Sequence, residues 1–302
     1  MSWKQWILGL GYLVFFMVSA MAMAFWQRRQ RKRRKPFPED FKLLRSPGET
    51  QLKWVLHFEE NLVLYVALAA LVPVLVTWPI LLLVQRLTGW WVLVGLAVLV
   101  IAFIGVFLVA ARWLRNKMTE GWDRYLGYFG ERFVAEQLDS LKAHGWKVFH
   151  DVPGEAHEKK FNLDHVAVGP GGVYVIETKT RRKGAARPGR KDNVVYFDGH
   201  VLDWPWGEDE HGLEQAERNA IWLAETIKAD AKERVHVSPI LALPGWWLEE
   251  RKPFKNPRLA RAANPKWLPR WLGESPEVLE PTRIEAIAAA LELRCRDVKY
   301  GA

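Results

Sequence analysis

Three residues suited to metal-assisted chemistry, Asp164, Glu177 and Lys179, lie within one short stretch of the chain, Phe161–Thr180. This stretch reads FNLDHVAVGPGGVYVIETKT, with runs of β-branched and aromatic residues on either side of Gly169–Gly172. Such a composition predicts a β-hairpin with a four-residue loop. Carboxylates bind divalent cations, so the register of the hairpin decides whether these residues can form a site.

The loop sets the register of this hairpin. It pairs Val168 with Val173, and the same register places the two carboxylates directly opposite each other. Asn162 is then expected opposite Lys179. Directly opposed side chains have Cβ atoms about 5 Å apart, where two carboxylates repel each other unless a positive group lies between them. The hairpin therefore predicts a divalent-cation site, with the lysine one step along the strand.

A solvent-exposed hairpin that merely carries charged residues is the alternative interpretation. The flanking residues argue against it, because they are apolar on both faces, as in a buried strand. These residues are Val166, Val168, Val173, Val175 and Ile176. Because burying a charged group is costly, charges beside such a run favour a functional site over a solvated surface.

The first third of the chain has the composition of a membrane protein. Three apolar segments are long enough to cross a bilayer, at about residues 6–26, 62–84 and 90–111. None of them contains Asp, Glu, Lys, Arg or His. Transport across a membrane usually needs such groups, so these segments indicate an anchor. A cleaved signal peptide is the alternative for the first segment, and Pro73 and Pro79 are expected to kink or break the second.

Basic residues set the expected topology. Residues 27–35 hold seven basic residues in nine, and Arg112, Arg115 and Lys117 follow the third segment. The positive-inside rule places both clusters in the cytoplasm. We therefore expect a multi-pass protein of the inner (cytoplasmic) membrane, with its N-terminus outside and residues 118–302 in the cytoplasm. Most of the formal net charge of +9 comes from the first cluster, which is also expected to contact anionic lipid head groups.

The chain is thus expected to have two parts, a membrane anchor (1–117) with a basic cytoplasmic linker (27–60) and a cytoplasmic domain (118–302). Periodicity predicts helices at 51–60, 120–144, 213–231 and 281–294, the first at the membrane surface, and strands at 146–152, 162–168, 173–180, 193–197, 200–204 and 235–243. Helices before and after a central run of strands predict a layered α/β domain. The single cysteine, Cys295, excludes an internal disulfide and any cysteine-based zinc site.

The order of motifs in the cytoplasmic part resembles that of a NERD domain, a nuclease-related domain of the PD-(D/E)XK group. The resemblance covers about residues 130–228 and rests on Gly130-Glu131, Leu163-Asp164-His165-Val166, Gly169-Pro170, Gly172 to Lys179, and Gln215. It implies a restriction-endonuclease-like α/β/α core with a mixed β-sheet, here preceded by three transmembrane α-helices. The basic insert Arg181–Lys191 and the acidic, tryptophan-containing approach to Gln215 depart from the family pattern.

The resemblance also implies a role for each motif residue. Asp164, Glu177 and the backbone carbonyl of Thr178 are expected to bind Mg²⁺, with Mn²⁺ as a substitute. Lys179 is expected to orient the attacking water and to offset charge in the transition state. Glu131 is expected either to reach the metal or to interact with the helix dipole.

Gln215 is expected to contact the substrate or the region of Lys179, whereas His165 points away from Asp164 by strand alternation and is interpreted as structural. The basic insert, as a mobile loop beside the site, would neutralise nucleic-acid phosphates through Arg181, Arg182, Lys183, Arg187, Arg190 and Lys191. A solvated or lipid-bound loop is the alternative. Four tryptophans, Trp204, Trp206, Trp246 and Trp247, would stack on bases or fill a core, and they are assigned no site.

We therefore expect a membrane-tethered, Mg²⁺-dependent nuclease that hydrolyses nucleic acid, DNA rather than RNA, at the cytoplasmic face, with entering foreign DNA as its biological target. A catalytically silent NERD-like module that binds nucleic acid or a protein partner at the membrane is the alternative. The complete set of Asp164, Glu177 and Lys179 favours the enzyme, because a binding module has no need of all three.

Overall fold

A computed structural model describes residues 11–12, 14–16, 18–19, 21–23, 25–26, 29–30, 41–156, 158–255 and 257–299. The chain forms two compact units, Met1–Leu44 with Arg296–Ala302, and Arg45–Cys295. In the first unit, strand β1 (Leu43–Leu44) pairs antiparallel with β11 (Arg296–Val298). Twelve of the 21 residues of the expected first span at 6–26 are described, and all twelve are helical, whereas seven of the nine residues of the basic cluster at 27–35 lie outside the described residues.

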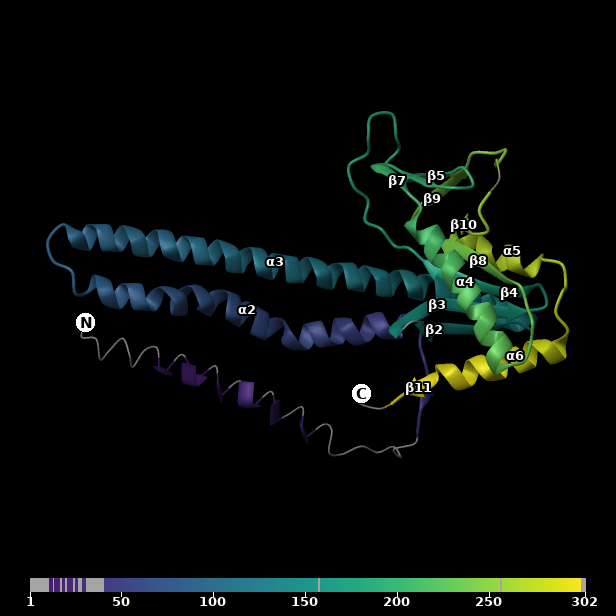
Figure 1. Cartoon of the computed structure of the whole chain (residues 1–302), viewed down its shortest axis with the longest axis horizontal. Coiled ribbons are helices and arrows are strands. Elements are labelled where there is room, and N and C mark those ends of the chain that lie inside the picture. The colour runs from purple at the N-terminus through teal and green to yellow at the C-terminus, as the bar shows by residue number, and fades with distance from the viewer. Residues whose placement is uncertain are drawn as a thin grey trace. The chain divides into compact units, whose positions relative to one another are not determined.

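In the second unit, two long helices, α2 (Glu49–Val84) and α3 (Trp91–Asp139), lie side by side as an antiparallel hairpin (Figure 1). Both are longer than predicted. The short helix expected at 51–60 is the beginning of α2 and not a separate surface helix. Pro73 and Pro79 do not break α2, and Thr77 Oγ1 donates to the Pro73 carbonyl oxygen, four residues earlier, at 2.7 Å.

Helix α3 joins two predicted elements. The third apolar segment and the amphipathic helix expected from residue 120 are one continuous helix, so the expected domain division at 117–118 would fall inside it. No proline interrupts the chain between them. A 3₁₀ turn, η1 (Ser140–His144), follows α3, and Gly145, with φ +81°, ends the helical region where the sequence predicted.

The outside of the α2–α3 hairpin is apolar. Val63, Leu93, Ile101 and Val109 are 80, 71, 70 and 71% exposed. By length and composition both helices can cross a membrane, so the described residues contain two such helices where three were expected. The core helix of a soluble protein would bury these side chains, whereas an exposed apolar surface of this extent marks a membrane or a binding partner.

Five strands form the sheet that carries the predicted β-hairpin, in the order β10–β8–β4–β3–β2. Their bounds are Lys147–Ala156 (β2), Lys159–Gly169 (β3), Gly172–Thr178 (β4), Val237–Ala242 (β8) and Arg261–Ala263 (β10). Strands β2, β3 and β4 are antiparallel, and β8 and β10 continue in parallel, so the sheet is mixed as expected. Val168 pairs with Val173 as predicted, but Gly169 also pairs with Gly172, so the loop has two residues and not four.

Helices cover both faces of this sheet. Helices α4 (His211–Asp230) and α6 (Pro281–Cys295) pack on the face that includes Val175. Helices α3 and α5 (Leu268–Gly273) pack on the face that includes Ile176. Successive strand residues point to opposite faces, so Val175 and Ile176 are buried on different sides of the sheet. Fully burying one side chain of this kind stabilises the fold by about 1.5–3 kcal/mol. The mixed α/β fold with helices on both faces is therefore confirmed.

A second, smaller sheet has the order β7–β6–β5–β9. Its strands are Val194–Phe197 (β5), Leu202–Trp204 (β6), Gly207–Asp209 (β7) and Trp247–Glu250 (β9). Trp204 and Trp246 are buried in its core, so these two tryptophans fill a core. Between residue 243 and the helix predicted at 281–294 no element was predicted, but this region contains β9, β10, the 3₁₀ turn η2 (Pro265–Trp267) and α5.

Candidate functional site

The two carboxylates of the hairpin meet where its regular pairing ends. His165 opposite Ile176 is the last pair between β3 and β4 on this side, and Asp164 and Glu177 are the next residues on the two strands. The Asp164 carboxylate accepts the backbone N–H of Thr178 at 2.6 Å, which fixes its orientation. The Asp164 side chain of β3 thus caps the end of β4, beside Glu177.

The expected opposition of Asn162 and Lys179 is wrong. Strand β4 ends at Thr178, and Asn162 pairs instead with Pro153 on β2. The backbone N–H of Lys179 donates to the Ala242 carbonyl oxygen at 2.9 Å, so this residue follows the parallel strand β8. Its ammonium charge nevertheless acts on the site, because it opposes the rise that burial causes in the pKa of both carboxylates.

Glu177 is buried and is held by a residue that the sequence reasoning missed. Asn219 Nδ2 of α4 donates to Glu177 Oε2 at 3.0 Å. Gln215, the predicted residue of this helix, lies one turn earlier on the same side and is partly buried. Its expected contact with the substrate stays a prediction. The spacing of four residues from Gln215 was the signal that could have identified Asn219.

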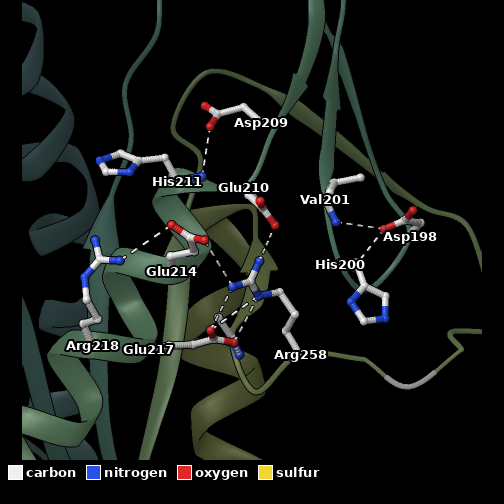
Figure 2. Close-up of polar contacts among 11 residues, drawn as sticks. Asp198, His200, Val201, Asp209, Glu210, His211, Glu214, Glu217, Arg218 and Arg258 are labelled. Atoms are coloured by element: carbon white, nitrogen blue, oxygen red, sulfur yellow. Dashed lines mark hydrogen bonds and ion pairs between the residues drawn. The ribbon is translucent and has the colours of Figure 1, made fainter.

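Helix α4 is fixed by a network around Arg258, which Figure 2 shows at the beginning of the helix. The Arg258 guanidinium pairs with Glu210 at 2.7 Å and Glu217 at 3.2 Å, and Glu217 also accepts the backbone N–H of Ala260 at 3.2 Å. These contacts join the loop before β10 to the first turns of α4. They hold the helix that carries Asn219 in place over the sheet.

Helix α3 brings Glu131 to the same place. A Cβ atom on the preceding residue, Gly130, would lie 1.8 Å from Thr180 Oγ1, so only glycine allows the helix to pass this close to the chain after β4. Glu131 is 5% exposed and hydrogen-bonds with Gln51 of α2. Among its two expected roles, the helix-dipole interaction loses support, because Glu131 lies near the C-terminal end of α3 and not at its beginning.

The sequence reasoning also missed an acidic residue of this site. Asp151 of β2 is buried and has a left-handed backbone, with φ +48°. Its carboxylate accepts Arg45 Nη1 and Thr50 Oγ1, each at 2.8 Å, and Arg45 Nη1 also donates to Asn162 Oδ1 at 3.1 Å. The segment just before and at the start of α2 therefore forms one wall of the site.

The carboxylates strongly influence one another. Burial, with the charges of Asp164, Asp151 and Glu177, raises the pKa of Glu131 to about 10. Burial also raises the pKa of Asp164 to about 7, and the N–H of Thr178 opposes that rise. The pKa of Glu177 lies well above its usual range for the same reason, burial, with a contribution from Asp164. In the absence of a cation, this cluster holds protons at neutral pH.

The side chains of the cluster offer oxygen ligands, the kind that magnesium prefers. In the described part of the chain, no three His, Cys, Asp or Glu side chains are grouped so that they could hold a metal by themselves. Mg²⁺ is usually bound by one or two carboxylates and keeps several waters. Asp164 and Glu177, with the backbone carbonyl of Thr178, supply oxygen ligands of this kind.

All four arginines of the basic insert have partners inside the protein. Arg187 and Arg190 both pair with the buried Asp203, the first at 2.6 Å, and Arg181 pairs with Asp209. Arg182 pairs with Asp123 of α3 at 3.0 Å. These contacts join the insert to the smaller sheet and to α3, so its arginines already have carboxylate partners. The mobility expected of the loop stays a prediction.

Two lysines of the insert differ from its arginines. Lys183 and Lys191 are exposed and have no ion pair among the described residues. The nucleic-acid-binding role expected of the insert therefore rests on them more than on its arginines.

His165 is buried opposite His150, with their Nδ1 atoms 2.9 Å apart. Burial lowers the pKa of His150 to about 4 and that of His165 well below its usual range, so both imidazoles are neutral near pH 7. One ring then donates to the other. This pair packs between the sheet and the end of α3, in agreement with the structural role expected for His165.

The fold and the site define a layered α/β domain with a buried carboxylate cluster at the end of its central strands. The family model described as NERD, nuclease-related domain, matches residues 126–244. This range contains Glu131, Asp164, Glu177 and Lys179, and it supports a nuclease-related function. Neither the curated proteins nor the solved structures contain a match to this chain.

Proposed function

We propose that this protein is a metal-dependent nuclease of the PD-(D/E)XK type with a restriction-endonuclease-like core, and that it hydrolyses phosphodiester bonds of DNA. One observation carries the proposal, the cluster formed by the buried Glu131 and Glu177 with the partly buried Asp164, within the range of the NERD match. Such a cluster destabilises a metal-free domain, because each carboxylate opposes ionisation of the others. A divalent cation removes that repulsion.

Asp164, Glu177 and the Thr178 carbonyl would hold Mg²⁺, or Mn²⁺ in its place. When bound, the ion supplies Lewis-acid polarisation of the phosphate and a water of lowered pKa. Asn219 and the Thr178 N–H orient the two carboxylates. Lys179, whose charge already acts on both carboxylates, would stabilise negative charge on the phosphoryl oxygens in the transition state.

Glu131 has a different role in this scheme. It is protonated at neutral pH before the metal binds, since its pKa is raised to about 10. Its proton is therefore available either for a hydrogen bond to a phosphate oxygen or for release when a cation arrives. Glu131 thus couples metal binding to pH.

We infer that α2 and α3 anchor the nuclease domain in the inner membrane. Residues 45–51, around the start of α2, contact Asp151 of β2 and Glu131 near the end of α3. These contacts hold the beginning of α2 beside the end of α3. The connection at residues 85–90 then lies across the bilayer, and Arg112 and Arg115 favour the cytoplasm for the domain. A C-terminal alkaline phosphatase fusion should be inactive and a C-terminal fluorescent protein fusion bright. An active phosphatase would contradict this topology.

Plasmid nicking tests the enzymatic proposal. The full chain in nanodiscs is the proper sample, because residues 118–302 alone would lack Arg45 and Thr50, which contact the site. We expect nicking with Mg²⁺ or Mn²⁺, none with EDTA, and none from Asp164→Asn. The silent module is the competing function. Binding of DNA without metal-dependent nicking under any of these conditions would establish it instead.

A further inference from the structure

A largely apolar groove of about 790 Å³ lies next to the carboxylate cluster. Its walls come from α3, from the chain after β4, from the region between β8 and β9, and from η2. Three aromatic side chains on these walls are strongly exposed, Phe129 at 60%, Trp247 at 59% and Trp267 at 60%. Flat aromatic faces open to solvent are the usual platforms for unpaired bases.

The charge of the groove is wholly positive. Its lining includes Arg181, Lys183 and Lys266 and no carboxylate. Arg181 is paired with Asp209, whereas both lysines are exposed and their side chains have no ion pair among the described residues. Two free ammonium groups between aromatic faces complement a chain that alternates phosphates with flat apolar rings.

The groove adjoins the candidate site. Gly130 and Thr180 both line it, and they are the neighbours of Glu131 and Lys179 in the chain. The contact between these two residues, which only glycine allows, forms the boundary between groove and cluster. A strand bound in the groove would therefore pass beside the two segments that carry Glu131 and Lys179.

A lipid surface is the competing occupant of an aromatic, basic groove. Phe129 lies 18 residues beyond Ala111, where the third apolar segment ends, on one uninterrupted helix. At 1.5 Å per residue, this separates them by about 27 Å along the helix axis, which is close to the thickness of the hydrocarbon core itself. The groove therefore belongs to the aqueous side of the molecule.

We propose that this groove binds a single, unpaired strand of nucleic acid and delivers it to the carboxylate cluster. Bases stack on Trp247, Trp267 and Phe129, and phosphates contact Lys183 and Lys266. Duplex bases are already stacked on each other and do not reach these rings. The inference rests on the proposed nuclease function and adds its substrate class, a single strand or an unpaired end.

Binding in EDTA tests the groove without any cleavage. Full-length protein in nanodiscs is titrated into a labelled oligothymidylate and into a duplex of equal length, and anisotropy is recorded. Trp247→Ala/Trp267→Ala should weaken single-strand binding by about tenfold or more, the effect of losing two stacking platforms. Lys183→Gln/Lys266→Gln should weaken it too and reduce its salt dependence. Trp122→Ala, equally exposed at 59% but outside the groove, and Lys255→Gln are the matched controls.

The proposal is overturned if wild-type protein does not bind the oligothymidylate. It is also overturned if the tryptophan variant loses duplex and single-strand affinity equally, or loses only binding to vesicles containing anionic lipid. Nicking measured in parallel separates the two proposals. If the tryptophan variant nicks normally and binds the single strand as wild type does, the groove proposal is wrong and the nuclease proposal stands. If wild-type protein does not nick but the variant selectively loses single-strand binding, the groove proposal stands and the nuclease proposal is wrong.

Discussion

The two halves of helix α3 meet opposite environments. In the first half, apolar side chains such as Leu93, Ile101 and Val109 are about 70% exposed. In the second half, Val134 and Leu138 are fully buried, and so is a carboxylate, Glu131. The first half thus exposes apolar side chains to the solvent, and the second half buries a carboxylate that water would otherwise solvate. The helix is continuous between them.

Each half therefore depends on a partner outside the protein. Exposed apolar surface of this extent requires lipid or another protein, and a buried carboxylate beside others requires a proton or a cation. The two requirements are independent, since the first concerns apolar area and the second concerns charge. Substitutions should therefore affect one half without affecting the other, and this separation can be tested.

The largest effect is expected from Asp164→Asn. The amide keeps the shape of the carboxylate but removes the charge of a proposed metal ligand and the repulsion that this charge exerts on Glu131 and Glu177. We expect cleavage below detection, weak Mg²⁺ binding by calorimetric titration, and a metal-free protein at least as stable as wild type. Membrane association should not change. Asp192→Asn, at an exposed position, is the control, and wild-type metal affinity in Asp164→Asn would show that the hairpin is not the site.

Lys179→Ala should have the next largest effect. The carboxylates remain, so Mg²⁺ should still bind in the titration. Nicking should fall about a hundredfold or more, the usual scale for losing one electrostatic contact to a transition state. Lys191→Ala, which removes an exposed lysine of the insert, should leave the nicking rate much closer to wild type. Equal rates for Lys179→Ala and wild type would assign this lysine a structural role only.

A charge placed in each half of α3 tests the comparison itself. Ile101→Lys puts a charge in the middle of the apolar segment, which costs about 2.5–3.5 kcal/mol of insertion free energy. We expect a larger fraction of the protein to be extracted by alkaline carbonate. Trp122→Lys, at a position that is also exposed, should stay in the membrane fraction. Equal extraction of the two variants would mean that no membrane distinguishes the halves.

The smallest effect concerns pH. Folding raises the pKa of Glu131 from 4.5 to about 10, so between these values the folded state binds more protons than the unfolded state. Stability of the metal-free protein then falls as pH rises, by up to about 1.4 kcal/mol per pH unit for one group. From pH 7 to 9, above the range where His150 titrates, we expect Glu131 alone to contribute a loss of about 2.7 kcal/mol in chemical denaturation.

Two further measurements identify the group responsible for this pH dependence. Glu131→Gln should flatten the decline in stability, because the amide does not titrate. Mg²⁺ should stabilise the wild-type protein more at pH 9 than at pH 7, because fewer protons must leave. A decline that persists unchanged in Glu131→Gln would assign it to another group.

Local pairing was predictable from the sequence, and distant contacts were not. The register that brings Asp164 to Glu177 follows from a short turn, so composition alone predicted it. The contact of Asn219 with Glu177 joins residues 42 apart, and that of Arg45 with Asp151 joins residues 106 apart. Such contacts depend on how whole elements pack, which hydrophobic periodicity does not specify.

The same distinction holds for the fold. The long apolar strands were predicted, whereas β9 was missed because it is short and pairs with β5, more than fifty residues earlier. The continuity of α3 was also missed, since the change of composition after Ala111 suggested an end to the helix. No proline stands there, and that absence was the available signal for one helix.

The tight passage of Gly130 against Thr180 has a consequence for how this chain can change over evolutionary time. Surface loops tolerate inserted residues, whereas each residue inserted into a continuous helix rotates one end of the helix relative to the other. One residue added between Ala111 and Gly130 would rotate everything beyond it by about 100° and carry Glu131 off the sheet. Seven added residues, nearly two full turns, would restore its direction to within about 20°. The distance from apolar segment to carboxylates can therefore lengthen only in such steps.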